Sequence, residues 1–600
     1  MKNFIQLTLV IFFALINSSV FSATYYVSPD GNDSSSGTAE SPWRTPGFAS
    51  KQLKPGDVLI IRAGEYIMRE FFTDMITLES SGEKDKWITI RGESLTNRPI
   101  IKGAGSLFAA IDISGRSYVK IENLEITSLI DNPYSGGLRE GIDAGGSGGG
   151  SVSHIEIRNV LIHHVEETGI NVSGNADHLR FEGVHIHHTG MTSLGCPSSN
   201  GGPGWQHVVI YRCKFEHAGM FYQGIEQVSP YDRPDGFGIE DSEGPIEIAY
   251  TVSQYNLGDG LDSKSKNTYI HHCIVANNFG DGVKIWGSGS KVENCLIYGT
   301  GYPRPTVQTP WTLLIIETDD KDGNFEIVNN TLFDDSSRPA HYSTVIQYDN
   351  CPATSINVTL RNNIIAGLKR AYVGGCVKLT ASNNLFFNRN EDEGVQLQHG
   401  DKFYTDTNIA SLGSGNIYSN PRFKNATWGP EADFHLTKES PAIDRGINGA
   451  GYTDYELEPR VWGSNVDIGA DEFKPEKLLD TKVIINGNST EGVKRLGYFS
   501  INVSLNAKGQ SKIAEYYLWA VVPGLGVYWY QYPWKWVKSD SPLITYQGEL
   551  VNLDNFKVFD GAGIDLPIGA YYLYFAVDTE LDGQVDLRSV SIAEMDLYEN

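Results

Sequence analysis

The sequence predicts an all-β protein in which a right-handed parallel β-helix is followed by a C-terminal β-sandwich. A short strand–turn–strand pattern recurs through the first two thirds of the chain, and longer alternating strands replace it after residue 475. Long helical stretches rich in Leu, Ala, Glu and Lys are missing. The 64 Gly and the 31 Tyr, 11 Trp and 25 Phe agree with a chain of turns and strands.

Size and charge narrow the range of possible functions. A chain of 600 residues exceeds the usual size of one domain, so two or three folding units are expected. A hydrophobic fraction of 40% and a charged fraction of 20% are typical of a folded globular protein. The 48 Lys and Arg against 73 Asp and Glu give a net charge of −25, which argues against a nucleic-acid partner.

The first 23 residues have the pattern of a secretory signal peptide. A positive start precedes an apolar run over residues 4–16, and small residues follow near Ser22 and Ala23. The alternative is an uncleaved anchor, but the run is shorter than the ~20 residues that span a bilayer. We therefore expect residues 1–23 to be removed and the rest to be secreted, to the periplasm or the outside, with no membrane span.

The recurring pattern predicts the β-helix over residues 24–473. A short helical turn is expected over residues 46–53, near its start. Gly183 follows Asn159 by 24 residues, and Cys295 follows Cys273 by 22, which are the steps of a solenoid. Nine turn residues are expected to stack as a ladder with the strand spacing of about 4.8 Å. They are Asn159, Gly183, Cys213, Thr251, Cys273, Cys295, Asn330, Asn363 and Asn383.

Stacked cysteines leave two alternatives open. Cys273 and Cys295 occupy the same turn position in consecutive coils, within reach of a disulfide, and an exported protein permits oxidation. Two reduced thiols in the ladder fit equally well. Cys351 and Cys376 are a second possible pair.

Residues 440–473 resemble the terminal cap of many exported bacterial β-helix proteins. The sandwich is predicted over residues 476–600, with strands near 498–505 and 570–577. Its aromatic run over residues 528–536 could stack on sugar rings, but core packing is the simpler interpretation.

Three consecutive coils carry Asp-Gly at one position. Asp235, Asp259 and Asp281 are 24 and 22 residues apart, so their side chains should form one column. Asp262 and Lys284 fall in a neighbouring column, three residues further on. Carboxylates this close repel unless a proton, a hydrogen bond or a cation neutralises them, and oxygen ligands suit Ca²⁺. The alternative is a purely conformational Asp-Gly turn ladder.

These residues resemble the site of the pectate lyases of polysaccharide lyase family 9, from the first strands to about residue 390. The family consists of calcium-dependent β-helices, so the resemblance implies Asp235, Asp259 and Asp262 as Ca²⁺ ligands and Lys284 as the general base. One departure is Gly258, where the family has an Asp. Without that aspartate, either the calcium affinity is lower or Asp281 takes its place as a ligand.

The expected chemistry is β-elimination on an acidic polysaccharide. A cation on the C6 carboxylate of a uronic acid would stabilise the transition state while neutral Lys284 takes the C5 proton. Flanking carboxylates oppose the loss of a proton from this lysine, which predicts an alkaline pH optimum. The candidate substrate-binding residues are Arg233, Lys264, Lys266 and Trp286, with a solvated turn as the alternative for the two lysines.

The leading hypothesis is therefore a secreted, monomeric, calcium-dependent lyase that acts on a pectate-like polymer. A non-catalytic glycan-binding surface β-helix of the adhesin type is the first alternative. A β-helical glycoside hydrolase is the second, but Lys284 would then have no role.

Overall fold

In the computed structural model, short strands and the turns that join them follow one another along almost the whole described chain. It describes residues 22–598, apart from 146–149, 197–200, 223–233, 303–311, 319–321, 335–355, 389–393, 449–452, 475–478, 486–489, 495–497, 511, 523–524, 533–534, 563–568, 584 and 586–588. The predicted signal peptide falls on residues 1–23, of which 1–21 lie outside the described residues. No helix in the described part of the chain is long and apolar enough to cross a bilayer.

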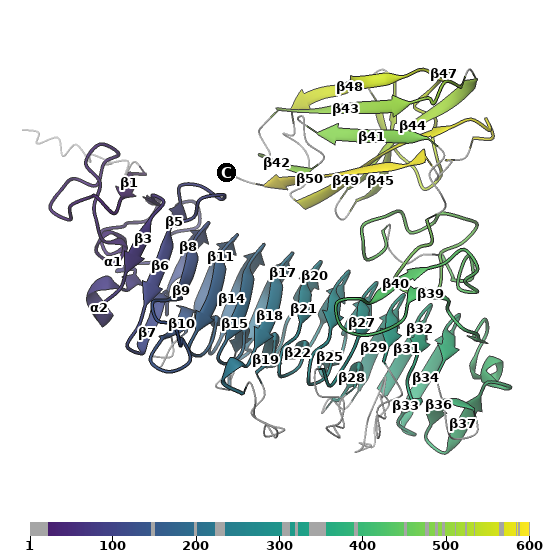
Figure 1. The fold of residues 1–600 in the computed structure, drawn as a ribbon, viewed down its shortest axis with the longest axis horizontal. Helices are drawn as coiled ribbons and strands as arrows, with labels where there is room; N and C mark the ends of the chain where they lie inside the picture. Colours follow the sequence, from purple (N-terminus) through teal and green to yellow (C-terminus); the bar gives the residue numbers. More distant parts are fainter. Residues whose placement is uncertain are drawn as a thin grey trace, which may run out of the picture. The chain divides into compact units, whose positions relative to one another are not determined.

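Three long parallel sheets form the walls of the β-helix (Figure 1). The first contains β1 (Thr24–Val27), β2 (Val58–Ile61), β5 (Ile88–Gly92), β8 (Ser117–Glu122), β11 (Val152–Arg158), β14 (Ala176–Glu182), β17 (Trp205–Tyr211), β20 (Ile246–Ala249), β23 (Thr268–His271), β26 (Lys291–Glu293), β29 (Gly323–Val328), β31 (Ile356–Arg361) and β34 (Val377–Ser382). The second contains β3 (Glu65–Ile67), β6 (Ile100–Gly103), β9 (Glu125–Ser128), β12 (Leu161–Val165), β15 (His185–Thr189), β18 (Lys214–Ala218), β21 (Val252–Gln254), β24 (Ile274–Ala276), β27 (Leu296–Tyr298), β30 (Thr331–Phe333), β32 (Ile364–Ala366), β35 (Leu385–Phe387) and β38 (Ile417–Tyr418).

The third sheet is the one that carries the candidate site. It contains β4 (Ile76–Thr77), β7 (Leu107–Asp112), β10 (Leu138–Asp143), β13 (Ile170–Asn171), β16 (Leu194–Cys196), β19 (Phe237–Ser242), β22 (Leu261–Ser265), β25 (Val283–Ile285) and β28 (Leu314–Ile316). Along the coils from β2 to β28, each coil supplies one short strand per sheet, which confirms the predicted parallel β-helix. Apolar side chains that alternate along the strands fill the interior, as with Val283 and Ile285, both fully buried.

Smaller elements accompany these sheets. Helix α1 (Pro46–Ser50) confirms the predicted helical turn, and α2 (Phe71–Asp74) and the 3-10 turns η1 (Met220–Tyr222) and η2 (Ile409–Leu412) are also short. Near the end of the coils, β33 (Ala371–Val373), β36 (Val395–His399) and β37 (Lys402–Thr405) form one small sheet, and β39 (Phe423–Asn425) and β40 (Asp433–Leu436) form another.

The chain divides into two compact units within the β-helix. One comprises residues 1–247 and 256–258, and the other comprises residues 248–255 and 259–600. The domain boundaries at 473 and 476 remain predictions.

The turn between the first and second sheets contains two columns rather than the single predicted ladder. The outer column has left-handed backbone, with φ between 51° and 61° at Asn159, Gly183, Arg212, Tyr250, His272, Asn294, Asn329, Asn362 and Asn383. The inner column is the next residue in each coil. The predicted ladder was therefore wrong by one residue at Asn159, Gly183 and Asn383, because Asn suits both the left-handed and the buried position.

The inner column contains the hydrogen-bonded asparagines that the prediction anticipated. Asn330 donates through Nδ2 to Asn363 Oδ1 at 3.1 Å, and Asn363 donates to Asn384 Oδ1 at 3.0 Å. Asn384 continues the ladder to Asn416 Oδ1 at 2.9 Å. All four side chains are buried, so each amide needs these partners to offset its desolvation.

Cys273 and Cys295 are buried free thiols in this column. Their Sγ atoms donate to the carbonyls of His271 and Glu293, both at 3.2 Å. Burial raises the pKa of the Cys295 thiol well above its usual range. Of the two alternatives, the structure therefore has Cys273 and Cys295 as reduced thiols. Cys376 is disulfide-bonded, whereas Cys351 lies outside the described residues.

The segment over residues 440–473 packs along the side of the coils rather than across the end of the stack. Thr453 O lies 3.2 Å from both His272 Nε2 and Asn294 Nδ2. Further along, Gly469 N donates to Asn362 O at 2.8 Å. The predicted cap is therefore a lateral strap over several turns of the second unit.

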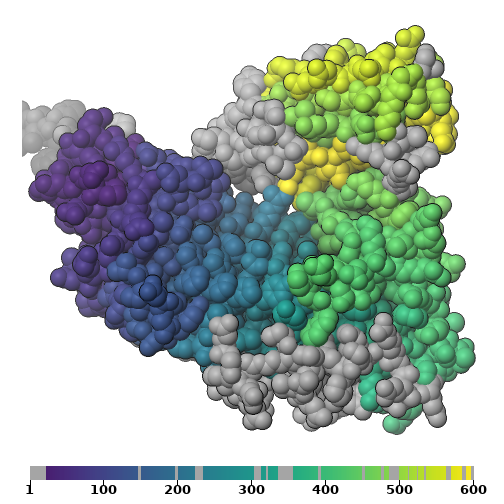
Figure 2. Space-filling view, viewed as in Figure 1, coloured from purple at the N-terminus to yellow at the C-terminus, as the bar shows by residue number. Residues whose placement is uncertain are grey.

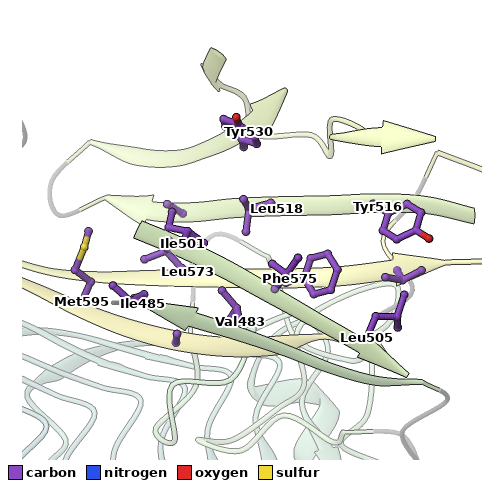
Figure 3. Close-up of a cluster of buried hydrophobic side chains, with 14 of the residues drawn as sticks. Val483, Ile485, Ile501, Leu505, Tyr516, Leu518, Tyr530, Leu573, Phe575 and Met595 are labelled. Carbon is purple, nitrogen blue, oxygen red and sulfur yellow. The ribbon is translucent and has the colours of Figure 1, made fainter. Parts of the chain in front are cut away.

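The C-terminal residues form two sheets around a shared core (Figure 1), which confirms the predicted sandwich. In the space-filling view this part of the chain is coloured light green to yellow (Figure 2). One sheet contains β41 (Asp480–Ile485), β43 (Tyr498–Asn506) and β48 (Leu553–Ala562). The other contains β42 (Thr490–Lys494), β50 (Ser591–Tyr598), β49 (Gly569–Asp578), β44 (Ile513–Val522), β45 (Gly526–Gln531), β46 (Lys535–Lys538) and β47 (Tyr546–Glu549). Figure 3 shows Ile501, Leu518 and Leu573 among the side chains of this core.

Most described aromatics of the 528–536 run are in contact with the interior. Trp529 is buried and stacks on Trp519 with ring centroids 4.9 Å apart, in a cluster that also contains Trp462 of the lateral strap. Tyr530 is fully buried in the sandwich core. These contacts favour the core interpretation of the run over sugar stacking, although Tyr532 is exposed.

Candidate active site

The predicted site residues of the second unit lie on adjacent strands of the third sheet. Strands β22 and β25 pair in parallel, with Asp262 opposite Lys284. Asp259 and Asp281 each lie two residues before one of these strands, and Gly260 N donates to Asp281 O at 2.8 Å. Since Val283 and Ile285 point into the core, alternation along β25 turns Lys284 to the outer face. The predicted register of these four residues is thus observed.

The Lys284 ammonium lies between two carboxylates. Its Nζ is 3.2 Å from Asp259 Oδ2 and 3.3 Å from Asp262 Oδ2. The side chains of Asp259 and Asp262 are only 8% and 6% exposed, and that of Lys284 is 18% exposed. Water therefore screens these contacts weakly, and each charge depends on the others for its stability.

Asp262 has an oxygen that the protein leaves unsatisfied. Its Oδ2 contacts Lys284 and, at 3.4 Å, Lys264, but its Oδ1 is buried without a hydrogen-bond partner among the described residues. Burial raises the pKa of Asp262, against the opposing effect of the two lysines. Asp259 and Asp262 offer carboxylate oxygens within 4.8 Å of each other. An orphaned oxygen in an oxygen-only donor set fits a hard divalent cation such as Ca²⁺.

Asp281 has a different environment from the other two acids. Its Oδ1 accepts hydrogen bonds from Thr312 N at 2.6 Å and Thr312 Oγ1 at 3.2 Å. Its own N–H donates to Asp259 Oδ1 at 2.7 Å. Burial, and next the charge of Asp259, raise the pKa of Asp281 to about 8. Its contacts therefore position the turn that holds Asp259.

Thr312 is a contributor that the sequence analysis missed. It occupies the next position of the Asp column, since Gly282 N donates to Thr312 O at 2.8 Å. It follows Asp281 by 31 residues, longer than the regular step, and carries no Asp-Gly signature. In the sequence, the only feature that could have pointed to Thr312 was a hydroxyl side chain shortly before the apolar strand β28.

The predicted substrate-binding residues divide into three groups. Lys264 lies beside Asp262, with its Nζ 5.7 Å from the ring centroid of half-buried Trp286. Lys266 is half-buried in the turn that follows β22. Arg233 lies outside the described residues. The structure therefore brings Lys264 and Trp286 to the acidic residues, and the assignment of Lys266 stays a prediction.

Asp235 belongs to the first unit, two residues before β19, as Asp259 stands before β22. Its side chain explains the glycine that departs from the family pattern. A Cβ on Gly258 would lie 2.4 Å from Asp235 Oδ1 and 2.5 Å from the carbonyl carbon of Pro234. Position 258 therefore has no room for an aspartate unless the backbone moves.

Comparisons with known proteins agree with this architecture. Residues 25–309 match a family model described as "Pel9A-like, right handed beta helix region", and residues 231–392 match one described as "Right handed beta helix region". The first match includes Asp235, Asp259, Asp262, Asp281 and Lys284.

Two curated relatives and one solved structure are similar to this chain. Pectate lyase PEL9 of Emericella nidulans is 24% identical over 308 residues, which cover 49% of this chain and 61% of the relative. The uncharacterized protein YwoF of Bacillus subtilis is 29% identical over 143 residues, 24% of this chain and 29% of that protein. The chain thus spans less than two thirds of either relative.

The crystal structure of pectate lyase Pel9A superposes with a TM-score of 0.42 at 16% identity, covering 75% of this chain and 96% of that structure. The family-model matches and the strand order confirm the resemblance stated from the Asp and Lys residues. The chain therefore contains a pectate-lyase-like right-handed parallel β-helix.

Proposed function

We propose that this protein is a calcium-dependent polysaccharide lyase that cleaves a uronic-acid polymer by β-elimination. One observation carries the proposal: Lys284 Nζ lies 3.2 and 3.3 Å from two buried carboxylates, and the described residues leave one oxygen of Asp262 unsatisfied. A purely conformational turn ladder has no need of a buried lysine between its acids. Export from the cell and a monomeric state are part of the proposal.

Asp259 and Asp262 would hold Ca²⁺, with Asp235 as a third ligand from the preceding coil. We now assign Asp281 a positioning role, because Thr312 occupies its Oδ1. When bound, Ca²⁺ would neutralise the C6 carboxylate of the uronate and stabilise the negative charge that develops as C5 loses its proton.

Lys284 acts as the base in this mechanism. After the ammonium has lost a proton to solvent, the neutral Nζ accepts the C5 proton, the electron pair of the broken C–H bond forms the C4–C5 double bond, and the bond between C4 and the glycosidic oxygen breaks. The leaving oxygen takes a proton from solvent, so the products are a new chain end and an unsaturated uronide. Asp259 and Asp262 hold the amine on the outer face of β25 before substrate binds.

Lys264 and Trp286 would bind the polymer beside this centre. The Lys264 ammonium offers a partner to a substrate carboxylate, and the half-buried indole of Trp286 offers an apolar platform for a sugar ring. These contacts are made equally in the ground and transition states. The Lys264→Ala variant should therefore raise KM more than it lowers kcat, and Lys266→Ala should do the same if Lys266 also binds the polymer.

The test is to incubate the full chain with pectate, alginate and other uronate polymers, with Ca²⁺ or with a chelator. We expect ultraviolet absorbance from an unsaturated product on at least one polymer, and no absorbance in chelator. New reducing ends without absorbance would instead identify a glycoside hydrolase. Binding of a polymer without either product would identify a non-catalytic glycan-binding protein.

A further inference from the structure

The first unit contains a second acidic pair with the spacing of the candidate active site. Glu140-Gly141-Ile142-Asp143 has the same pattern as Asp259-Gly260-Leu261-Asp262. Gly141 N and Ile142 N donate to the carbonyls of Thr168 and Gly169, the next coil, at 3.1 and 3.0 Å. Gly260 and Leu261 make the equivalent bonds to Asp281 and Gly282 at 2.8 and 3.0 Å. The two acidic pairs therefore occupy equivalent positions of their coils.

One residue distinguishes the two pairs. Strand β10 pairs with β13 so that Asp143 lies opposite Asn171, whereas Asp262 lies opposite Lys284. Asn171 Nδ2 is 3.4 Å from Glu140 Oε1 and 3.2 Å from Asp143 Oδ1. A neutral amide thus stands where the proposed active site has its base.

Both carboxylates are removed from water. Glu140 is 6% exposed and Asp143 is fully buried. Ser114 Oγ donates to Asp143 Oδ2 at 3.0 Å, but Glu140 Oε2 is buried without a hydrogen-bond partner among the described residues. The neighbouring Arg139 is held by both oxygens of Glu167, at 3.0 and 2.8 Å. The described residues therefore leave one oxygen of Glu140 unsatisfied near a second buried carboxylate.

Such a carboxylate requires a proton or a cation. A proton would neutralise Glu140 alone. A divalent cation satisfies both carboxylates at once, and oxygen donors favour Ca²⁺.

We propose a second divalent-cation site, of the Ca²⁺ type, at Glu140 and Asp143, with Ser114 and the amide oxygen of Asn171 as neutral donors. The Asn171 side chain would turn its oxygen to the ion. Because no lysine accompanies this pair, the site binds a cation without catalysing elimination and stabilises the coils of the first unit. It stands independently of the proposed lyase activity.

The test is a calorimetric titration of the chelator-treated full chain with Ca²⁺ alone. We expect two equivalents for the unaltered chain, and one for Glu140→Gln. Glu167→Gln is the matched control: it removes a half-exposed carboxylate from the next coil and should keep the equivalents of the unaltered chain.

An equal number of equivalents in the unaltered chain and in Glu140→Gln would overturn the proposal. If Glu140→Gln fails to fold, the double variant Asp259→Asn/Asp262→Asn decides, because it should retain the Glu140 equivalent. Loss of all binding in that variant would contradict the second site. Failure of the lyase assay would leave these stoichiometries unchanged.

Discussion

Replacing Lys284 by Met would remove the ammonium and keep the apolar stem, so it isolates the charge between Asp259 and Asp262. At 3.2 Å and an effective dielectric constant of about 20, opposite charges attract by about 5 kcal/mol, part of which offsets desolvation of the amine. Loss of one partner of a buried pair typically costs about 3–5 kcal/mol. Lys264 still contacts Asp262, so we expect about 3 kcal/mol.

Calcium should reverse this loss. In Lys284→Met the two carboxylates have lost an ammonium that competes with the cation, so Ca²⁺ binds more tightly than in the unaltered chain. A ligand at about 100 times its Kd stabilises the folded state by about 2.7 kcal/mol. The unaltered chain also gains stability from Ca²⁺, so only the tighter binding by the variant narrows the gap. The variant should therefore be much less stable than the unaltered chain in chelator, and the difference should be smaller in excess Ca²⁺.

Urea unfolding, followed by tryptophan fluorescence in chelator and in Ca²⁺, measures both effects. Lys102→Met is the matched control, because Lys102 pairs at 2.6 Å with Glu65, whose side chain is 55% exposed. We expect the control to lose at most about 1 kcal/mol, with no added response to Ca²⁺. The reasoning is refuted if Lys284→Met loses no more stability in chelator than this control, or if Ca²⁺ restores nothing.

Three further predictions concern the metal ligands, the asparagine ladder and the lateral strap. Asp262→Asn should weaken Ca²⁺ binding to the proposed active site by about tenfold or more, measured by calorimetry. Unchanged affinity would show that other residues bind the cation. Asn363→Ala leaves the buried Asn330 N–H and the Ile327 carbonyl unpaired, so urea unfolding should show a loss of about 2–4 kcal/mol, and a loss below 1 kcal/mol would contradict the ladder's role. The hydrogen bond to Glu456, and next the one to Asp433, raise the pKa of His435 to about 9, so its stabilisation is complete below about pH 6.5 and lost as the pH rises through 9. Since a third of the side chain is exposed, the free energy of unfolding of the unaltered chain should fall by about 1–2 kcal/mol over this pH range, and that of His435→Gln should not.

The sequence was sufficient for the fold because each coil repeats the same physical requirement. Apolar residues alternate along short strands, and a small or left-handed residue follows each strand, so the period is visible without tertiary information. The same periodicity placed Asp262 opposite Lys284, as the structure has them. The ladder register was wrong by one residue at Asn159 because asparagine suits both columns of the turn.

Other features depend on contacts that spacing alone does not reveal. Thr312 joins the Asp column after an irregular step of 31 residues, and its role depends on hydrogen bonds to Asp281. The strap over residues 440–473 depends on hydrogen bonds to several coils distant in sequence, so its lateral position was not predictable. Glu140 was not predicted because it carries Glu-Gly in place of the Asp-Gly signature.

The most direct test of the central claim is the turnover of Lys284→Ala on the polymer that the unaltered chain degrades, at saturating Ca²⁺. We expect the rate at which ultraviolet absorbance increases to fall by about 10²–10⁴-fold, with Ca²⁺ binding retained. Lys284→Arg should restore little, because a guanidinium rarely gives up its proton. Lys291→Ala, which removes a lysine paired with Glu293 on another sheet, should keep normal turnover. Near-normal turnover in Lys284→Ala would contradict the account and direct the search for the base to Lys264, Lys266 and Arg233.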